Sequence, residues 1–268
     1  VLPVAFLVTN LVSASNAEDE SSESQSRGPN LLFIFLDDYG WRDCGFMGSD
    51  FYETPNLDKL ATQGMVFTDA YSAAANCAPA RACLLSGGYT PRHEIYNVGT
   101  DRRGPKNFGR LKHIPGVDTL PSKTVTWAKV AQDAGIVTGS IGKWHLSDDP
   151  KPYGFDVNIG GTHSGSPPKG YFPPHPKAPG LRDAPESEYL TDRLTNESIG
   201  FIEENHDKQW LLYLTHFAVH TPLQAKPELV AKYEAKPKGN LHDSAVMAAM
   251  IQSVDEGVGK IAQTLAQL

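Results

Sequence analysis

The sequence predicts an α/β fold in which helices sandwich a mostly parallel, mixed β-sheet. Two continuous apolar runs of strand length, residues 30–36 and 209–215, have the pattern of strands that are buried on both faces of a parallel sheet. Segments with helical periodicity alternate with such runs along the chain, as they do in α/β domains. The 268 residues include 24 Gly and 20 Pro, which favours long shaped loops over a helical bundle.

The other elements follow from local patterns along the chain. A helix is expected after residue 54, where Thr54 can cap it and Pro55 can occupy its first position. Residues 150–185 are rich in Pro and Gly and are expected to form a long irregular loop. Short strands are predicted at residues 65–67 and 136–141, and helices at residues 124–133, 188–204 and 228–234.

Residues 243–268 form the last predicted element, an amphipathic helix. Apolar residues recur there at a spacing near the ~3.6 residues of a helical turn. The pattern is still running at Leu268, with no Gly or Pro stop signal. A helix with one apolar face needs a partner to pack against, so we expect a chain that is cut within a longer protein.

The first residues have the composition of a secretory signal peptide. Residues 1–12 are mostly apolar, and small residues follow at Ser13, Ala14, Ser15 and Ala17. This run is shorter than the ~20 apolar residues of a membrane-spanning helix, so no membrane span is predicted. We expect a signal peptide at residues 1–17, export to the periplasm or the extracellular space, and a disordered linker at residues 18–28. A frayed apolar terminus is the alternative.

The net charge excludes one class of partner. The chain carries 24 Lys and Arg against 31 Asp and Glu, a formal net charge of −7. An acidic chain is not suited to bind nucleic acid by neutralising phosphates. A hydrophobic fraction of 40% with 21% charged residues is close to the globular average, so a sizeable core is expected.

Polar residues follow three of the predicted strands. Asp37 and Asp38 follow the first apolar run, Lys143 and His145 follow the strand at residues 136–141, and His216 and His220 follow residues 209–215. Ligands of parallel sheets gather at the carboxyl ends of the strands. These side chains are therefore expected to converge in one cleft.

A second motif carries a candidate nucleophile. The chain reads Cys77-Ala78-Pro79-Ala80-Arg81, followed by Leu84, Leu85 and Gly87. This stretch resembles the signature of the sulfatase family, Cys-x-Pro-x-Arg followed by a helix with Leu and Gly. The resemblance extends over about residues 30–260, through the segments at residues 37–38, 54–58, 142–146, 154–156 and 220–222.

The resemblance implies an alkaline-phosphatase-like fold and a modified nucleophile. Residues 29–268 would be an incomplete N-terminal catalytic domain. A maturation enzyme would convert Cys77 to formylglycine, whose aldehyde hydrates to a diol. One hydroxyl of the diol attacks the sulfur of a sulfate ester and expels the alcohol, and the other loses its proton and ejects sulfate.

Further residues suit that chemistry. Asp37 and Asp38 are hard oxygen donors that suit Ca²⁺ better than Mg²⁺, and modified Cys77 would complete the metal contacts. Arg81 lies one helical turn after Cys77 and can steady the diol. Lys143 can hold a sulfate oxygen and His145 is a candidate base for the diol. His220 would contact the substrate and protonate the leaving alcohol. Ser164 or His163 would contact the sulfate.

Several alternatives remain open at this point. Cys77 and Cys83 could form a structural disulfide, leaving Cys44 over. His216 and His220 have zinc-like spacing, although Pro222 argues against a helix there. A phosphate-ester hydrolase of the same superfamily is one rival function, because a metal, a nucleophile at the sheet end and cationic side chains serve either ester. A noncatalytic pseudoenzyme is the other, because the chain has no Asp-Asn pair with which sulfatases complete their metal site. A sulfated carbohydrate is favoured over an aryl sulfate as the substrate.

Overall fold

The computed structural model describes residues 5–8, 28–100, 112–183 and 185–268. Its centre is a five-stranded sheet with the order β1-β2-β5-β3-β4. The first strand runs antiparallel to its neighbour and the other four are parallel, which confirms the predicted mixed α/β sheet. The strands are β1 (Ala5–Val8), β2 (Leu31–Phe35), β3 (Val137–Gly142), β4 (Val157–Ile159) and β5 (Trp210–Thr215).

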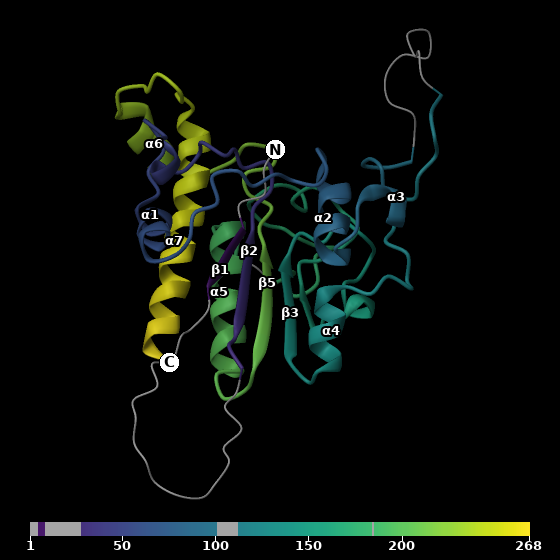
Figure 1. The fold of residues 1–268 in the computed structure, drawn as a ribbon. Helices are drawn as coiled ribbons and strands as arrows, with labels where there is room; N and C mark the ends of the chain where they lie inside the picture. Colours follow the sequence, from purple (N-terminus) through teal and green to yellow (C-terminus); the bar gives the residue numbers. More distant parts are fainter. Residues whose placement is uncertain (1–4, 9–27, 101–111, 184) are drawn as a thin grey trace, which may run out of the picture.

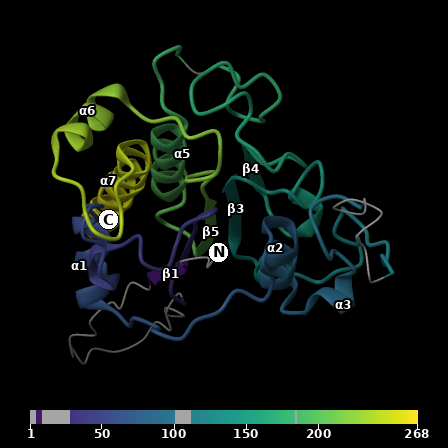
Figure 2. The same cartoon turned by 90° about the horizontal axis from the view of Figure 1, so that it is seen from above.

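Helices lie on both faces of this sheet (Figure 1). Seen from above, α5 (Leu190–Glu204) and α7 (Ala245–Gln267) lie on one side of the strands, and α2 (Cys77–Ser86) lies on the other (Figure 2). The helix α4 (Trp127–Asp133) packs against β3. The remaining helices are α1 (Pro55–Gln63), α3 (Thr90–His93), α6 (Pro227–Ala235) and the short 3-10 helices η1 (Gly45–Met47) and η3 (Lys151–Tyr153).

The core has two parts because strand residues alternate between the faces of the sheet. Leu32, Ile34, Leu212 and Leu214 belong to the cluster that contains α5 and α7. The alternate positions, Phe35, Leu211 and Tyr213 among them, pack with residues of α2 and α4. Both faces are therefore buried, as the continuous apolar runs predicted.

The start of α1 depends on a residue that is distant in the sequence. Pro55 occupies the first helical position, as expected, but the side chain of Thr54 makes no capping hydrogen bond. Asp255 of α7 accepts hydrogen bonds from the backbone N–H groups of Asn56 at 3.2 Å and Leu57 at 2.8 Å. The helix is therefore capped by a buried carboxylate of α7.

Two predictions about secondary structure are wrong. Residues 65–67 form no strand, and Met65 is 79% and Phe67 72% exposed. No strand of the described residues pairs with this segment, and β propensity alone does not fix a strand. Residues 150–185 are not wholly irregular, because they contain η3 and β4. The strand β4 was not predicted because its three residues are too few to show the alternation of apolar and polar residues that identifies a strand.

The ends of the chain lie partly outside the described residues. The predicted signal peptide and linker fall mostly on residues 1–4 and 9–27, which lie outside the described residues, so both stay predictions. The described part of the first segment is β1, which pairs with β2. Among the helices that the structure describes, none is long and apolar enough to cross a membrane.

Candidate active site

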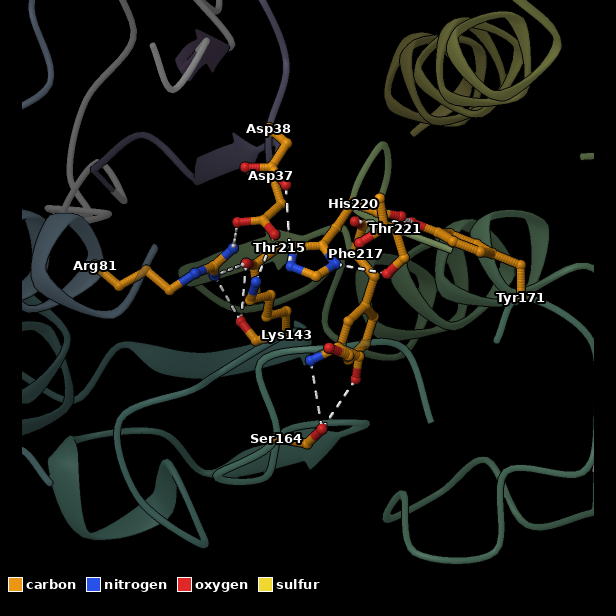
Figure 3. A network of polar contacts seen from close by, with 11 residues as sticks. Asp37, Asp38, Arg81, Lys143, Ser164, Tyr171, Thr215, Phe217, His220 and Thr221 are labelled. Atoms are coloured by element: carbon orange, nitrogen blue, oxygen red, sulfur yellow. Dashed lines mark hydrogen bonds and ion pairs between the residues drawn. The ribbon is translucent and has the colours of Figure 1, made fainter. Parts of the chain in front are cut away.

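Some of the polar residues that were expected to converge come together at the carboxyl edge of the sheet, whereas the side chain of His216 makes no hydrogen bond to any described residue. Asp37 follows β2, Lys143 follows β3, and Arg81 enters from α2. The three side chains are joined by ion pairs, and His220 lies beside them (Figure 3). Segments that lie far apart in the sequence therefore form one polar cluster.

Asp37 is the centre of this cluster. It is 4% exposed, and its Oδ1 lies 3.1 Å from Nη2 of Arg81. Its Oδ2 accepts a hydrogen bond from Nζ of Lys143. Burial opposes ionisation, but the charges of Arg81 and Lys143 outweigh it and lower the pKa of Asp37. The carboxylate is thus ionised at neutral pH.

Arg81 connects four elements of the fold. Its Nη1 donates to the carbonyl oxygen of Lys143 at 2.7 Å and to Oγ1 of Thr215 at 2.5 Å. Its guanidinium carbon lies 5.0 Å from the ring centroid of Phe35. Because the side chain is 0% exposed, these contacts fix the guanidinium in one position. Sequence reasoning missed Thr215, whose only signal was a polar residue at the end of a buried strand.

Lys143 directly follows β3 and is hydrogen-bonded to Thr215, the last residue of β5. Its N–H donates to the carbonyl oxygen of Thr215 at 2.7 Å. The preceding Gly142 has a φ of 107°, and a Cβ there would lie 1.9 Å from the same oxygen, so only glycine fits. Burial and then the charge of Arg81 lower the pKa of Lys143. Asp37 nevertheless gives its ammonium a direct counter-charge.

His145 is a buried, neutral imidazole. Burial, together with the charges of Lys143 and Arg81, lowers its pKa to about 3. Its Nδ1 makes no hydrogen bond to any described residue. Gly165 packs against this ring so closely that a Cβ would lie 2.3 Å from Cε1. A neutral ring with a free nitrogen can accept a proton.

Cys77 is the first residue of α2 and is half-buried. It lines a recess together with Asp37, Asp38 and Asn76. All three cysteines are free, so the alternative of a Cys77–Cys83 disulfide is not present. The two residues lie six positions apart on one helix, about 9 Å along its axis, which is too far for a disulfide. The Cys83 sulfur instead lies 3.3 Å from Nε2 of His93.

A likeness to known proteins agrees with this arrangement. A family model described as Sulfatase matches residues 29–268. The chain belongs to the sulfatase family. The match confirms the alkaline-phosphatase-like fold that the motifs implied, and it places Cys77 and Arg81 within the matched region.

Three similar proteins show how much of the chain is shared. Arylsulfatase G of Rattus norvegicus is 31% identical over 90% of this chain and 49% of its own length. N-acetylgalactosamine-6-sulfatase of Mus musculus is 29% identical over 90% of this chain and 47% of its own. The crystal structure of Ps i-CgsB in complex with k-i-k-neocarrahexaose aligns with a TM-score of 0.67 at 32% identity, covering 88% of this chain and 54% of that one. The chain thus spans about half the length of the curated relatives it matches.

The carboxylates of this sulfatase chain fit a divalent ion. Asp37, Asp38 and His220 each offer one ligand atom, and these atoms lie within 4.8 Å of one another. Asp38 is 45% exposed at its side chain and has a φ of 55°, a left-handed conformation that Asp tolerates. Carboxylate oxygens suit Ca²⁺, whereas imidazole nitrogen does not. The two aspartates therefore fit the ion that the family implies.

Two histidines differ in their relation to this site. Nε2 of His220 lies 3.9 Å from Oδ2 of Asp38, and its Nδ1 lies 2.6 Å from the carbonyl oxygen of Thr221. His216 is 1% exposed and neither of its nitrogens has a hydrogen-bond partner in the described part of the chain. Among the described residues, His216 is not in the group that could hold a metal ion.

Ser164 and His163 occupy different surroundings. Ser164 is exposed, and its hydroxyl donates to the carbonyl oxygen of Ser166 at 3.0 Å, outside the cluster around Asp37 (Figure 3). The ring of His163 lies edge-on to that of His145, with 6.4 Å between centroids. The structure thus joins His163, and not Ser164, to a residue of the candidate site.

Proposed function

We propose that this chain carries the catalytic residues of a sulfuric ester hydrolase that removes sulfate from a sulfated carbohydrate. The observation that carries the proposal is the position of Cys77 in one recess with Asp37 and Asp38, at the sheet edge where Arg81 and Lys143 are buried. Cysteine is the residue from which sulfatases make formylglycine. A sulfated-sugar substrate is supported by the name of one relative, N-acetylgalactosamine-6-sulfatase, and a carbohydrate ligand by the neocarrahexaose complex of Ps i-CgsB.

The charges of the site favour an anionic group. Arg81 and Lys143 together balance the charges of Asp37 and Asp38, so a divalent ion held by the two carboxylates would give the site a positive balance. The recess also contains the first residue of α2, and helix N-termini attract anions. A sulfate ester next to Cys77 would be held by both features.

The proposed cofactors are formylglycine made from Cys77 and one Ca²⁺. When present, they supply a hydrated aldehyde as nucleophile and a charge that offsets negative charge developing on oxygen. Asp37 and Asp38 would hold the ion, and Asp37 is already ionised because of its two cationic neighbours. Arg81 would orient Asp37 and Lys143 around the modified residue.

His145 and His220 can move the protons of the reaction. The Nδ1 of His145 has no hydrogen-bond partner among the described residues, so it can accept a proton from the nucleophile, although its lowered pKa makes it a weak base. His220 has Nδ1 at 2.6 Å from the Thr221 carbonyl oxygen, which directs Nε2 toward Asp38. When both ring nitrogens carry a proton, Nδ1–H faces the Thr221 carbonyl and the proton on Nε2 can be transferred to the alcohol as the sulfate ester breaks.

Export and maturation complete the proposal. The apolar residues 1–12 support a signal peptide and hence a periplasmic or extracellular place. A formylglycine-generating enzyme would be the maturation partner, because cysteine does not become an aldehyde unaided. The substrate partner would be a sulfated small molecule or glycan.

Matched ester substrates test the reaction type. The longest natural polypeptide that includes these residues is assayed with Ca²⁺ on the sulfate and the phosphate ester of one alcohol. We expect faster hydrolysis of the sulfate ester, and loss of that activity in Cys77→Ala. Faster hydrolysis of the phosphate ester would instead support the related phosphate-ester hydrolase. Equal activity of Cys77→Ala would exclude this residue as the nucleophile.

A further inference from the structure

His220 lies in a turn whose hydrogen bonds come from two sides. On one side, Asp37 N–H donates to the carbonyl oxygen of Ala218 at 2.9 Å, and Val219 N–H donates to that of Asp37 at 2.6 Å. Within the turn, His220 N–H donates to the carbonyl oxygen of Phe217 at 2.9 Å. These backbone hydrogen bonds attach the turn to Asp37, just after β2, but none of them is accepted by the carbonyl oxygen of His220.

The donor to the His220 carbonyl oxygen is the hydroxyl of Tyr171. Its oxygen lies 2.8 Å from the carbonyl oxygen of His220 and 2.9 Å from that of Phe217 (Figure 3). The two carbonyls bracket the turn, and one phenolic hydrogen serves both. Tyr171 is 0% exposed, so no water replaces this contact easily. Burial raises the pKa of Tyr171, and the hydroxyl therefore stays a donor at any working pH.

Tyr171 is itself held in place by Gln224 and by the start of α5. Its N–H donates to Oε1 of Gln224 at 2.9 Å, and its carbonyl accepts from Leu190 N–H at 2.9 Å. Its ring stacks on Tyr189 with 5.6 Å between centroids and 23° between planes. The Tyr189 hydroxyl donates to the carbonyl oxygen of Gln224 at 2.8 Å. These contacts hold the Tyr171 side chain in one position, so its hydroxyl can fix the position of the turn.

We propose that Tyr171 is a positioning residue: its hydroxyl, held between the carbonyls of Phe217 and His220, sets the turn that presents the His220 imidazole to Asp38. The inference rests on the proposed function, in which His220 protonates the leaving alcohol. Without the hydroxyl, the His220 carbonyl loses its buried donor and the following peptide is free to rotate. The Nδ1 contact with the Thr221 carbonyl then weakens, and Nε2 is no longer directed toward the site.

The first test needs no turnover. Nitrogen NMR of the 268-residue chain, labelled at its 9 histidines, identifies the protonated ring nitrogen of neutral His220, which is assigned with His220→Gln. In the parent chain we expect the proton on Nδ1, facing Thr221. In Tyr171→Phe the signal is expected to move toward the Nε2–H form. An unchanged tautomer in folded Tyr171→Phe would overturn the proposal.

Tyr233→Phe is the matched control. Tyr233 is also 0% exposed, and no hydrogen bond of the described residues joins its hydroxyl to the His220 turn, so the same atom is removed without a change at that turn. We expect its His220 spectrum to match the parent. Should Tyr171→Phe not fold, Gln224→Ala removes the acceptor of the Tyr171 N–H from an exposed position, and a smaller shift in the same direction is expected.

The second test separates positioning from general loosening. In the longest natural polypeptide that includes these residues, Tyr171→Phe should lower kcat about tenfold on a sugar sulfate, whose alcohol needs a proton, with KM nearly unchanged. On 4-nitrophenyl sulfate, whose leaving group needs none, kcat should change by less than about twofold. Equal losses on both esters would contradict a positioning role. If the parent hydrolyses neither ester, the proposed function fails while the tautomer still decides the role of Tyr171.

Discussion

Asp37 shows how one carboxylate can hold a site together. It is buried between Arg81 and Lys143 and accepts from both. An uncompensated charge in a protein interior is costly, so each member of this trio depends on the others. The same carboxylate is a proposed metal ligand, which links the stability of the sheet edge to its chemistry.

Removal of this charge should destabilise the chain. We expect Asp37→Asn to lower the free energy of unfolding by about 3–5 kcal/mol, because Arg81 and Lys143 then lack their counter-charge. Asp38→Asn is the control, since Asp38 is half exposed and should change stability by less than about 0.5 kcal/mol. Urea unfolding of both variants gives the comparison. Equal midpoints would show that the trio contributes little to stability.

His216 predicts a pH dependence of stability. Burial lowers its pKa to about 4, whereas a histidine in an unfolded chain titrates near ~6.5. Between these values the unfolded chain binds a proton that the folded chain does not, so stability rises with pH. The contribution is complete above pH ~6.5 and is lost as the pH falls toward the folded value.

Replacement of His216 should therefore reduce the acid sensitivity. From pH ~6.5 to ~4.5, the parent should lose about 2 kcal/mol more stability than His216→Leu. His206→Leu, which replaces an exposed histidine, should keep the parental slope. Urea midpoints at the two pH values measure this difference. A parental slope in His216→Leu would mean that this ring is charged in the folded chain or is not buried.

At the scale of elements, α1 and α7 form one unit through Asp255. Its carboxylate accepts from the backbone of Asn56 and Leu57 at the start of α1. We expect Asp255→Ala to cost about 1–2 kcal/mol, as the loss of a helix cap does. Glu256→Ala removes an adjacent, more exposed acid whose ion pair with Lys226 spans 3.3 Å, and it should cost less than about 0.5 kcal/mol. Thermal unfolding distinguishes them; equal costs would contradict capping by Asp255.

The sequence predicted those elements whose own residues determine them. The apolar runs of β2 and β5 identified buried strands, and the period of α7 identified a helix. The segment at residues 65–67 has similar residues but no partner strand among the described residues. β4 is an edge strand of three residues, which leaves no period to detect. Pairing partners, unlike propensities, cannot be read from a local window.

The residues of the candidate site that stand in local motifs could likewise be predicted from the sequence. Cys77, Arg81, Lys143 and His145 stand in motifs, and the structure places Arg81, Lys143 and Asp37 in direct contact. Thr215 and Tyr171 could not be found in this way, because each acts through a single hydroxyl that meets backbone carbonyls distant in the sequence. Only the tertiary structure shows those contacts.

At the scale of the whole molecule, the metal site limits what these residues can do alone. Ca²⁺ takes about 6–8 oxygen ligands, and the described residues bring two carboxylates to the site. Aligned relatives are about twice as long as this chain. We expect negligible hydrolysis of a chromogenic aryl sulfate by these 268 residues with calcium. Turnover at the rate of a complete sulfatase would contradict this ligand count.

The chemical state of Cys77 tests the central claim most directly. Mass spectrometry of the peptide that contains it, taken from the protein made in its own host, distinguishes a thiol from an aldehyde. The account predicts a mass about 18 Da below that of the cysteine form, as expected when a thiol becomes an aldehyde. An unmodified thiol in the mature native protein would contradict the proposed mechanism.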